Sequence, residues 1–265
     1  MKIIFIGDIV GRPGREAVKK ILPELRDKYK PDLILANAEN LSHGIGVSEK
    51  SVEEMERAGI QFFTSGNHVY HNRLIIPKLD DKKFPVIRPA NFPPGNPGRG
   101  YEVIETGKME KVLIINLMGR VFIPQNYDCP FRAVDKILED HSHENLSAIF
   151  VDFHAEATSE KIAMAHYLDG RVTALVGTHT HIPTADAQIF PEKMAYVTDV
   201  GMVGAKDSII GAEKEGIIQS FLTQQSFKYE IPDYGPKTFG AVYIETELNS
   251  KEAIKIEQII ETIND

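Results

Sequence analysis

Short apolar segments of strand length recur along this chain and alternate with helical patterns. The clearest are residues 2–7 (KIIFIG), 32–38 (DLILANA), 60–66 (IQFFTSG), 147–153 (SAIFVDF) and 172–178 (VTALVGT). Helical patterns with start or stop signals lie at residues 14–29, 48–58 and 158–168, the first disturbed by Pro23. An alternation of strand, helix and strand predicts an α/β protein built on parallel strands.

Other segments predict antiparallel additions to this framework. Residues 101–105 and 111–117 are expected to pair as a hairpin, after a Pro- and Gly-rich loop at 90–100. Further helices are expected after Asn67 and from about Phe131. Additional strand candidates are residues 86–88, 188–190, 195–198, 240–247 and 254–260.

Composition limits the class of protein. The 265 residues, 42% hydrophobic and 26% charged, are expected to form a single domain over 1–265. The only cysteine, Cys129, excludes an intramolecular disulfide and a cysteine-based zinc site. The first apolar run breaks at Asp8, so neither a signal peptide nor a membrane span is predicted, and a cytoplasmic location is expected. A net charge of −8 without a dense basic run argues against a broad nucleic-acid-binding surface.

Polar side chains of metal-ligand type directly follow five of the apolar segments. They are Asp8, Glu39, Asn40, Asn67, His68, His154, His179 and His181. Because the carboxyl ends of parallel strands line one crevice, we expect these side chains to converge. Each alone is better explained by a structural role, as a helix cap, a turn residue or a core histidine. Together they indicate a metal site, and their mixture of carboxylate, amide and imidazole donors suits manganese, iron or zinc.

The spacing of the donors allows two neighbouring ions. In THTH, an extended backbone would project the rings of His179 and His181 to one side, about 7 Å apart at the backbone. A carboxylate such as Glu39 can bridge two ions about 3.5 to 4 Å apart. Glu156, Thr158, Ser159 and Asp199 are candidates for orienting the imidazoles. The glycines of GDIVGRPG do not have the spacing of a dinucleotide-binding loop.

The motifs GDIVG, NAEN, SGNH, DFHAEATSEK and GTHTH, in this order, resemble those of the calcineurin-like metallophosphoesterase superfamily. The chain is more similar still to the bacterial YmdB-like branch, over nearly its whole length and including RPANFP. The resemblance implies a four-layer α/β/β/α sandwich with two mixed sheets.

The resemblance also implies roles for single residues. Asp8, Glu39, Asn40 and His181 would hold one metal, and Glu39, Asn67, His154 and His179 the other. His68 falls at the position of the family's proton donor. The wider superfamily has Asp-x-His and a bridging aspartate, whereas Val10 and Glu39 stand here, so the first metal has one nitrogen ligand fewer and Asn40 is the natural oxygen replacement. The branch implies iron or manganese, and zinc stays open.

The activity implied is phosphodiester hydrolysis by in-line attack of a metal-bridging hydroxide, with His68 protonating the leaving oxygen. Nucleoside 2′,3′-cyclic monophosphates are the leading substrate class. Two alternatives stay open: a phosphomonoesterase, and a metal-containing regulator that binds a nucleotide or protein partner with little turnover. No membrane partner is expected, and assembly into a homo-oligomer is left open.

Overall fold

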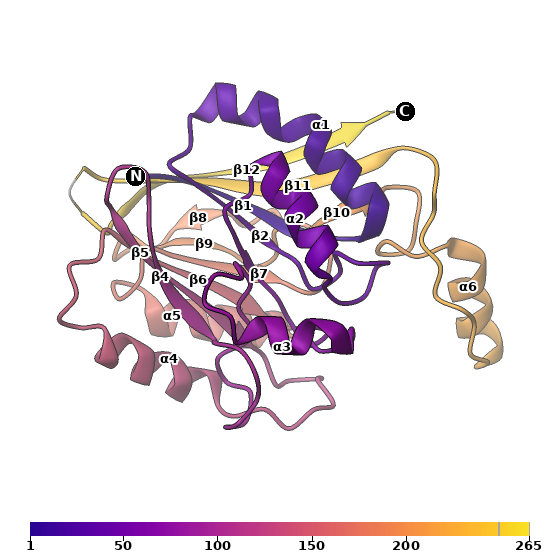
Figure 1. Ribbon diagram of the computed structural model, residues 1–265, viewed down its shortest axis with the longest axis horizontal. Helices are drawn as coiled ribbons and strands as arrows, with labels where there is room; N and C mark the ends of the chain where they lie inside the picture. The colour runs from indigo at the N-terminus through magenta and orange to yellow at the C-terminus, as the bar shows by residue number, and fades with distance from the viewer. Residues whose placement is uncertain (249, 265) are drawn as a thin grey trace.

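A computed structural model describes residues 1–248 and 250–264, in which the strands form two six-stranded sheets (Figure 1). The first sheet contains β1 (Lys2–Ile9), β2 (Leu33–Asn37), β3 (Phe62–Thr64), β10 (Met202–Ala205), β11 (Lys237–Thr246) and β12 (Ala253–Ile263). The second contains β4 (Tyr101–Glu105), β5 (Lys111–Met118), β6 (Ala148–His154), β7 (Ala174–Thr178), β8 (Gln188–Ile189) and β9 (Ala195–Val197).

Both sheets are mixed, and their parallel parts are the strands that the sequence predicts most clearly. In the first sheet, β10, β1, β2 and β3 run parallel, and β11 and β12 add antiparallel strands. In the second sheet, β5, β6, β7 and β9 run parallel, with β4 and β8 antiparallel at the two edges. The predicted hairpin of β4 and β5 is confirmed.

The sheets stack face to face, and helices cover their outer faces (Figure 1). Alternate residues of β1 illustrate the layering, because Ile4 packs in the core on the helix side and Phe5 in the core between the sheets. The Phe5 ring lies 5.1 Å from the ring of Phe150 across the interface between the sheets. The outer helices are α1 (Gly11–Tyr29) and α2 (Glu49–Ala58) on the first sheet, and α4 (Pro130–Asp140) and α5 (Thr158–Leu168) on the second. The predicted four-layer α/β/β/α sandwich is confirmed.

Some boundaries differ from those expected. α1 begins at Gly11 rather than residue 14, since Pro13 fits the first turn of a helix, where its missing N–H has no intrahelical partner. Residues 86–88 make only an isolated bridge, Phe63 to Val86, instead of a strand. The helix expected after Asn67 is reduced to a 3₁₀ turn, η1 (Arg73–Ile75), and one turn of α-helix, α3 (Ile76–Leu79).

Two elements have no sequence prediction. β10 has the sequence MVGA, which lacks the run of β-branched or aromatic residues that marks a strand. α6 (Lys214–Thr223) buries none of its residues and projects away from the sandwich (Figure 1), and its side chains Ile218, Phe221 and Leu222 are exposed. Across residues 1–248 and 250–264, none of the helices combines the length and apolar character that crossing a membrane requires.

Candidate metal centre

The predicted site residues lie where the carboxyl ends of β1, β2, β3, β6 and β7 meet. Asp8 lies within β1, one residue before its end, and His154 is the last residue of β6. The other candidates lie in the loops that directly follow β2, β3 and β7. Strands of both sheets therefore contribute to one site.

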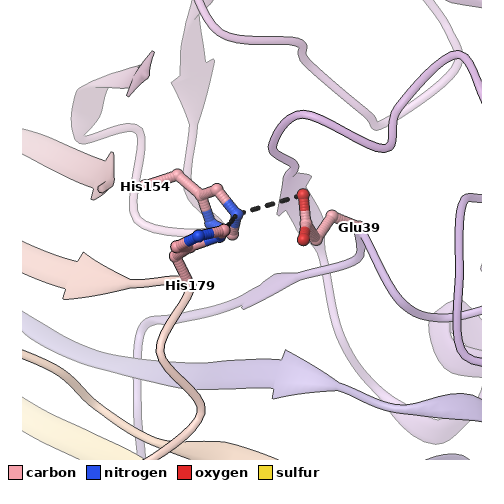
Figure 2. A group of neighbouring side chains, drawn as sticks. All are labelled: Glu39, His154 and His179. Carbon is pink, nitrogen blue, oxygen red and sulfur yellow. Dashed lines mark hydrogen bonds and ion pairs between the residues drawn. The ribbon is translucent and has the colours of Figure 1, made fainter. Parts of the chain in front are cut away.

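Glu39, His154 and His179 form its centre (Figure 2). One donor atom from each side chain lies within 4.8 Å of the other two. Glu39 Oε2 is 3.0 Å from His154 Nε2, and His154 Nε2 is 3.0 Å from His179 Nδ1. Two imidazole nitrogens that face each other and a carboxylate at this distance require a proton or a cation between them.

The second nitrogen of each histidine has its own acceptor, which determines which nitrogen is free. His154 Nδ1 is 2.8 Å from the Thr178 hydroxyl, and His179 Nε2 is 3.2 Å from the Glu156 carboxylate. His181 Nδ1 donates to the carbonyl oxygen of Ile210 at 2.8 Å. Imidazoles that donate from one nitrogen present the unprotonated other nitrogen as a metal ligand.

The THTH segment is not extended. His179 has φ of 97° and His181 has φ of 67°, both in the left-handed region that non-glycine residues seldom adopt. The two rings therefore do not project to one side as an extended strand would place them, and they find separate partners in Glu156 and Ile210. Backbone outliers of this kind concentrate at functional sites.

Three further candidates present oxygen atoms without hydrogen-bond partners among the described residues. Oδ1 of Asp8, Asn40 and Asn67 is buried, and none of the three accepts a hydrogen bond from residues 1–248 or 250–264. Asn40 Nδ2 donates to the Gly44 carbonyl at 2.7 Å, which fixes the amide. A buried, unsatisfied oxygen is destabilising by about 1–3 kcal/mol, and three in one site fit an oxygen-binding cation.

His68 lies at the solvent side of the same carboxylate. Its Nδ1 is 3.1 Å from Glu39 Oε1, and its side chain is 36% exposed. Its backbone N–H donates to Glu39 Oε2 at 3.3 Å. His68 is therefore accessible to solvent, whereas His154 is completely buried.

Asp152 is a buried residue behind the site that sequence reasoning missed. The Thr178 hydroxyl donates to Asp152 Oδ1 at 2.7 Å, so that hydroxyl must accept from His154 Nδ1. Asn37 donates to Asp152 Oδ2 at 2.9 Å and accepts from the backbone N–H of Glu39 at 3.0 Å. Asp152 thus connects the two sheets and helps to fix both Glu39 and His154. Its signal in the sequence is a carboxylate inside the apolar run SAIFVDF, two residues before His154.

A buried ion pair supports the THTH loop. Lys161 Nζ is 2.8 Å from Asp199 Oδ2 and donates to the Thr178 carbonyl at 2.9 Å. Asp199 accepts from the backbone N–H and the hydroxyl of Thr180. Asp199 therefore orients the backbone of the loop that carries His179 and His181, rather than one of their imidazole rings.

Of the other residues expected to orient imidazoles, Glu156 contacts His179 directly. Thr158 and Ser159 are exposed in the first turn of α5. The hydroxyl that orients His154 belongs to Thr178 instead.

The charges of the centre are strongly coupled in the metal-free protein. Burial raises the pKa of the Glu39 carboxyl, but the charge and hydrogen bond of His154 outweigh this and hold the pKa well below its usual range. Burial lowers the pKa of His154, yet the neighbouring Glu39 charge raises it to about 9. Burial and the His154 charge lower the pKa of His179 to about 3. Without metal, a protonated His154 therefore neutralises Glu39.

We expect the stability of the chelated protein to fall between pH 6.5 and pH 9. The pKa of His154 is about 9 when folded and ~6.5 when unfolded, so its contribution is complete below pH 6.5 and is lost as pH rises through 9. The difference corresponds to about 3 kcal/mol of unfolding free energy. Urea unfolding across this range measures it, and His154→Gln should flatten the curve. Equal stability of the chelated wild-type protein at pH 6.5 and 9 would contradict the ion pair.

A cavity of about 310 Å³ opens onto this centre. One part of the cavity is lined by side chains of the candidate centre, including Glu39, Asn40, His68 and His179. Its volume lies at the lower end of the ~300–1,000 Å³ typical of small-molecule sites. The cavity therefore has room for a small ligand beside the donor cluster.

Comparison with known proteins places the chain in a family. It is 43% identical to the 2′,3′-cyclic-nucleotide 2′-phosphodiesterase of Bacillus subtilis, over 100% of this chain and 98% of that protein. A crystal structure of a novel phosphatase from Mycoplasma pneumoniae matches with a TM-score of 0.92 and 38% identity, over 100% of this chain and 94% of that one. A hypothetical protein from Thermus thermophilus matches with a TM-score of 0.91 and 40% identity, over 99% of this chain and 100% of that one. The family profile described as "YmdB-like protein" matches residues 4–259, and the chain belongs to this YmdB-like family.

Proposed function

We propose that this phosphoesterase hydrolyses small phosphodiesters with two metal ions held at the candidate centre. The observation that carries the proposal is the inward-facing pair of imidazole nitrogens, 3.0 Å apart, beside the Glu39 carboxylate. The buried oxygens of Asp8, Asn40 and Asn67, which have no partners in the described part of the chain, are further donors that two ions could share out between them. The family to which the chain belongs implies metal ions, in agreement with this donor set.

The donors divide into two sets that share Glu39. Glu39, Asn67, His154 and His179 would hold one ion, and Asp8, Glu39, Asn40 and His181 the other. The first set contains the close contacts among Glu39, His154 and His179. The mixture of oxygen and nitrogen donors suits manganese, iron or zinc, and the resemblance to the YmdB-like branch implies iron or manganese.

The ions, when bound, would neutralise phosphate charge and lower the pKa of water. The residues of this chain supply position and proton transfer. The Asp152 and Thr178 hydrogen bonds hold His154 in one tautomer, and the Lys161–Asp199 pair holds the loop that carries His179 and His181. His68, exposed to the cavity, would protonate the leaving oxygen.

For His68→Ala, we expect a loss that depends on the leaving group. General acid catalysis contributes about 10²- to 10⁴-fold where the leaving oxygen is basic, and little where it leaves as p-nitrophenolate. Rates on a nucleoside 2′,3′-cyclic phosphate and on bis(p-nitrophenyl) phosphate measure the difference. Equal losses on both substrates, or none on the cyclic phosphate, would refute the proton-donor role.

Nucleoside 2′,3′-cyclic monophosphates are the substrate class that we propose. The support is the activity for which the Bacillus subtilis relative is named, together with the small-molecule size of the cavity. Opening of the 2′-ester would leave a nucleoside 3′-monophosphate, so the position of the product phosphate is a direct check.

Metal analysis coupled to three assays tests the function. Purified protein is assayed on a 2′,3′-cyclic nucleotide, bis(p-nitrophenyl) phosphate and p-nitrophenyl phosphate, before and after chelation. We expect two ions per chain and chelation-sensitive diesterase activity, restored by iron or manganese. Preference for the monoester would indicate a phosphomonoesterase, and metal-loaded protein that binds nucleotide without turnover would indicate a regulator.

A further inference from the structure

The cavity at the centre has an apolar wall as well as its metal-ligand side. Ile45, Ile210 and Tyr229 line it together with the donors. Ile210 and Tyr229 come from residues 206–236, here called the arm, which connects β10 to β11 and carries α6 outward (Figure 1). The arm closes at its base, where the Lys206 N–H donates to the Pro236 carbonyl at 2.8 Å.

Ile210 occupies a strained turn. Ile209 and Ala212 exchange two backbone hydrogen bonds of 2.9 Å, and between them Ile210 has φ of 45° and Gly211 has φ of 101°. Such two-residue turns favour Asn-Gly, and a β-branched residue at positive φ is a genuine outlier. The hydrogen bond from His181 to the Ile210 carbonyl accounts for the unusual backbone conformation of this turn, but a residue of any type could provide that carbonyl. The hydrogen bond therefore does not explain why the side chain is isoleucine, which is 46% exposed and lines the cavity.

Tyr229 lies close to the loop that carries Asn40. A Cβ on Gly44 would lie 3.0 Å from Tyr229 Cε1, and Gly44 accepts the side-chain hydrogen bond of Asn40. The ring therefore lies beside the proposed ligand loop, with 37% of the residue exposed. An aromatic ring offers a large stacking surface at a low cost in side-chain entropy.

We propose that Tyr229, with Ile210 and Ile45, forms a subsite for the nucleobase of the substrate. The inference rests on the proposed function, since the phosphate must lie at the donor cluster for the base to reach this wall. A base stacked on Tyr229 would contact Ile210 at its edge, and the wall offers flat apolar area rather than base-specific donors. We therefore expect this subsite to accept both purine and pyrimidine bases.

Binding of two product analogues to the metal-loaded protein tests the subsite without turnover. The probes are adenosine 3′-monophosphate and methyl β-D-ribofuranoside 3-phosphate, which lacks the base, and calorimetry gives both dissociation constants. We expect the base to tighten binding roughly 5- to 100-fold in the wild-type protein. Tyr229→Ala should remove most of this preference and leave the base-free probe unchanged, whereas Tyr229→Phe should retain it. Ile210→Asn, which suits the turn, should weaken only the base-bearing probe.

Tyr234→Ala is the matched control, because Tyr234 lies on the same arm, is 88% exposed and does not line the cavity at the centre. It should bind both probes as the wild type does. Equal affinity of the wild-type protein for both probes, or equal weakening of both by Tyr229→Ala, would overturn the subsite. A hydrolysis assay distinguishes this inference from the proposed function. If the protein prefers the base-bearing probe but hydrolyses no diester, the subsite is supported and the proposed activity is rejected.

Discussion

In Glu39→Gln, phosphodiester turnover is expected to fall by about 10³-fold or more, with bound metal reduced. Glu39 is the carboxylate that contacts both His154 and His68, at 3.0 and 3.1 Å, and it is 1% exposed. If Glu39 is shared by both ions, as we propose, its loss should reduce turnover by more than the roughly 10- to 100-fold caused by disturbing a group that only orients a metal ligand. Glutamine keeps the shape of the side chain, so the loss reports on charge and metal binding rather than on packing.

Glu156→Gln is the matched control for Glu39→Gln. It makes the same chemical change beside His179, but at a side chain that is 48% exposed. We expect a loss of no more than about 100-fold and a normal metal content. Metal content by mass spectrometry and kcat on bis(p-nitrophenyl) phosphate measure both variants. A Glu39→Gln protein with full metal content and wild-type turnover would exclude Glu39 as a bridge.

For Gly66→Ala, we expect loss of activity from the smallest possible increase in side-chain size. A Cβ at Gly66 would overlap Glu39 Oε2 and the His154 ring, so at least one of them must move. Displacement of catalytic groups by about 1 Å reduces rates about 10²-fold, and overpacking is destabilising by about 1–3 kcal/mol. We therefore expect about 10²-fold lower turnover and a melting temperature several degrees lower.

Gly107→Ala provides the comparison for Gly66→Ala. A Cβ at Gly107 meets no atom of the described residues within 4 Å, and its backbone conformation suits alanine. We expect turnover and melting temperature to stay at their wild-type values. Normal turnover in Gly66→Ala would show that Glu39 and His154 do not approach Gly66 as described.

The fold was largely predictable because its parallel strands are buried on both faces. Apolar runs such as KIIFIG give a strong signal, and polar residues at their ends predicted which edge of each sheet carries the site. β10 and α6 were not predicted, because the MVGA segment of β10 lacks a run of β-branched or aromatic residues and because α6 is a short helix that does not pack on the core. The arm therefore could not be placed over the site in advance.

The sequence indicated the donors of the site better than their surroundings. Each donor follows an apolar run, whereas the partners that orient them come from separate elements. Thr178 and Glu156 lie beside predicted donors, but the Ile210 carbonyl is a backbone group, invisible to residue type. The left-handed backbone of His179 and His181 also has no sequence signal, because glycine and asparagine are the residues that normally mark it.

Anomalous diffraction from a crystal of the metal-loaded protein, recorded on both sides of the iron and manganese edges, tests the central claim most directly. We predict two anomalous peaks about 3.5–4 Å apart, with the Glu39 carboxylate between them. His154 and His179 should bind one ion, and Asp8 and His181 the other. A single ion, or two ions away from Glu39, would contradict the account.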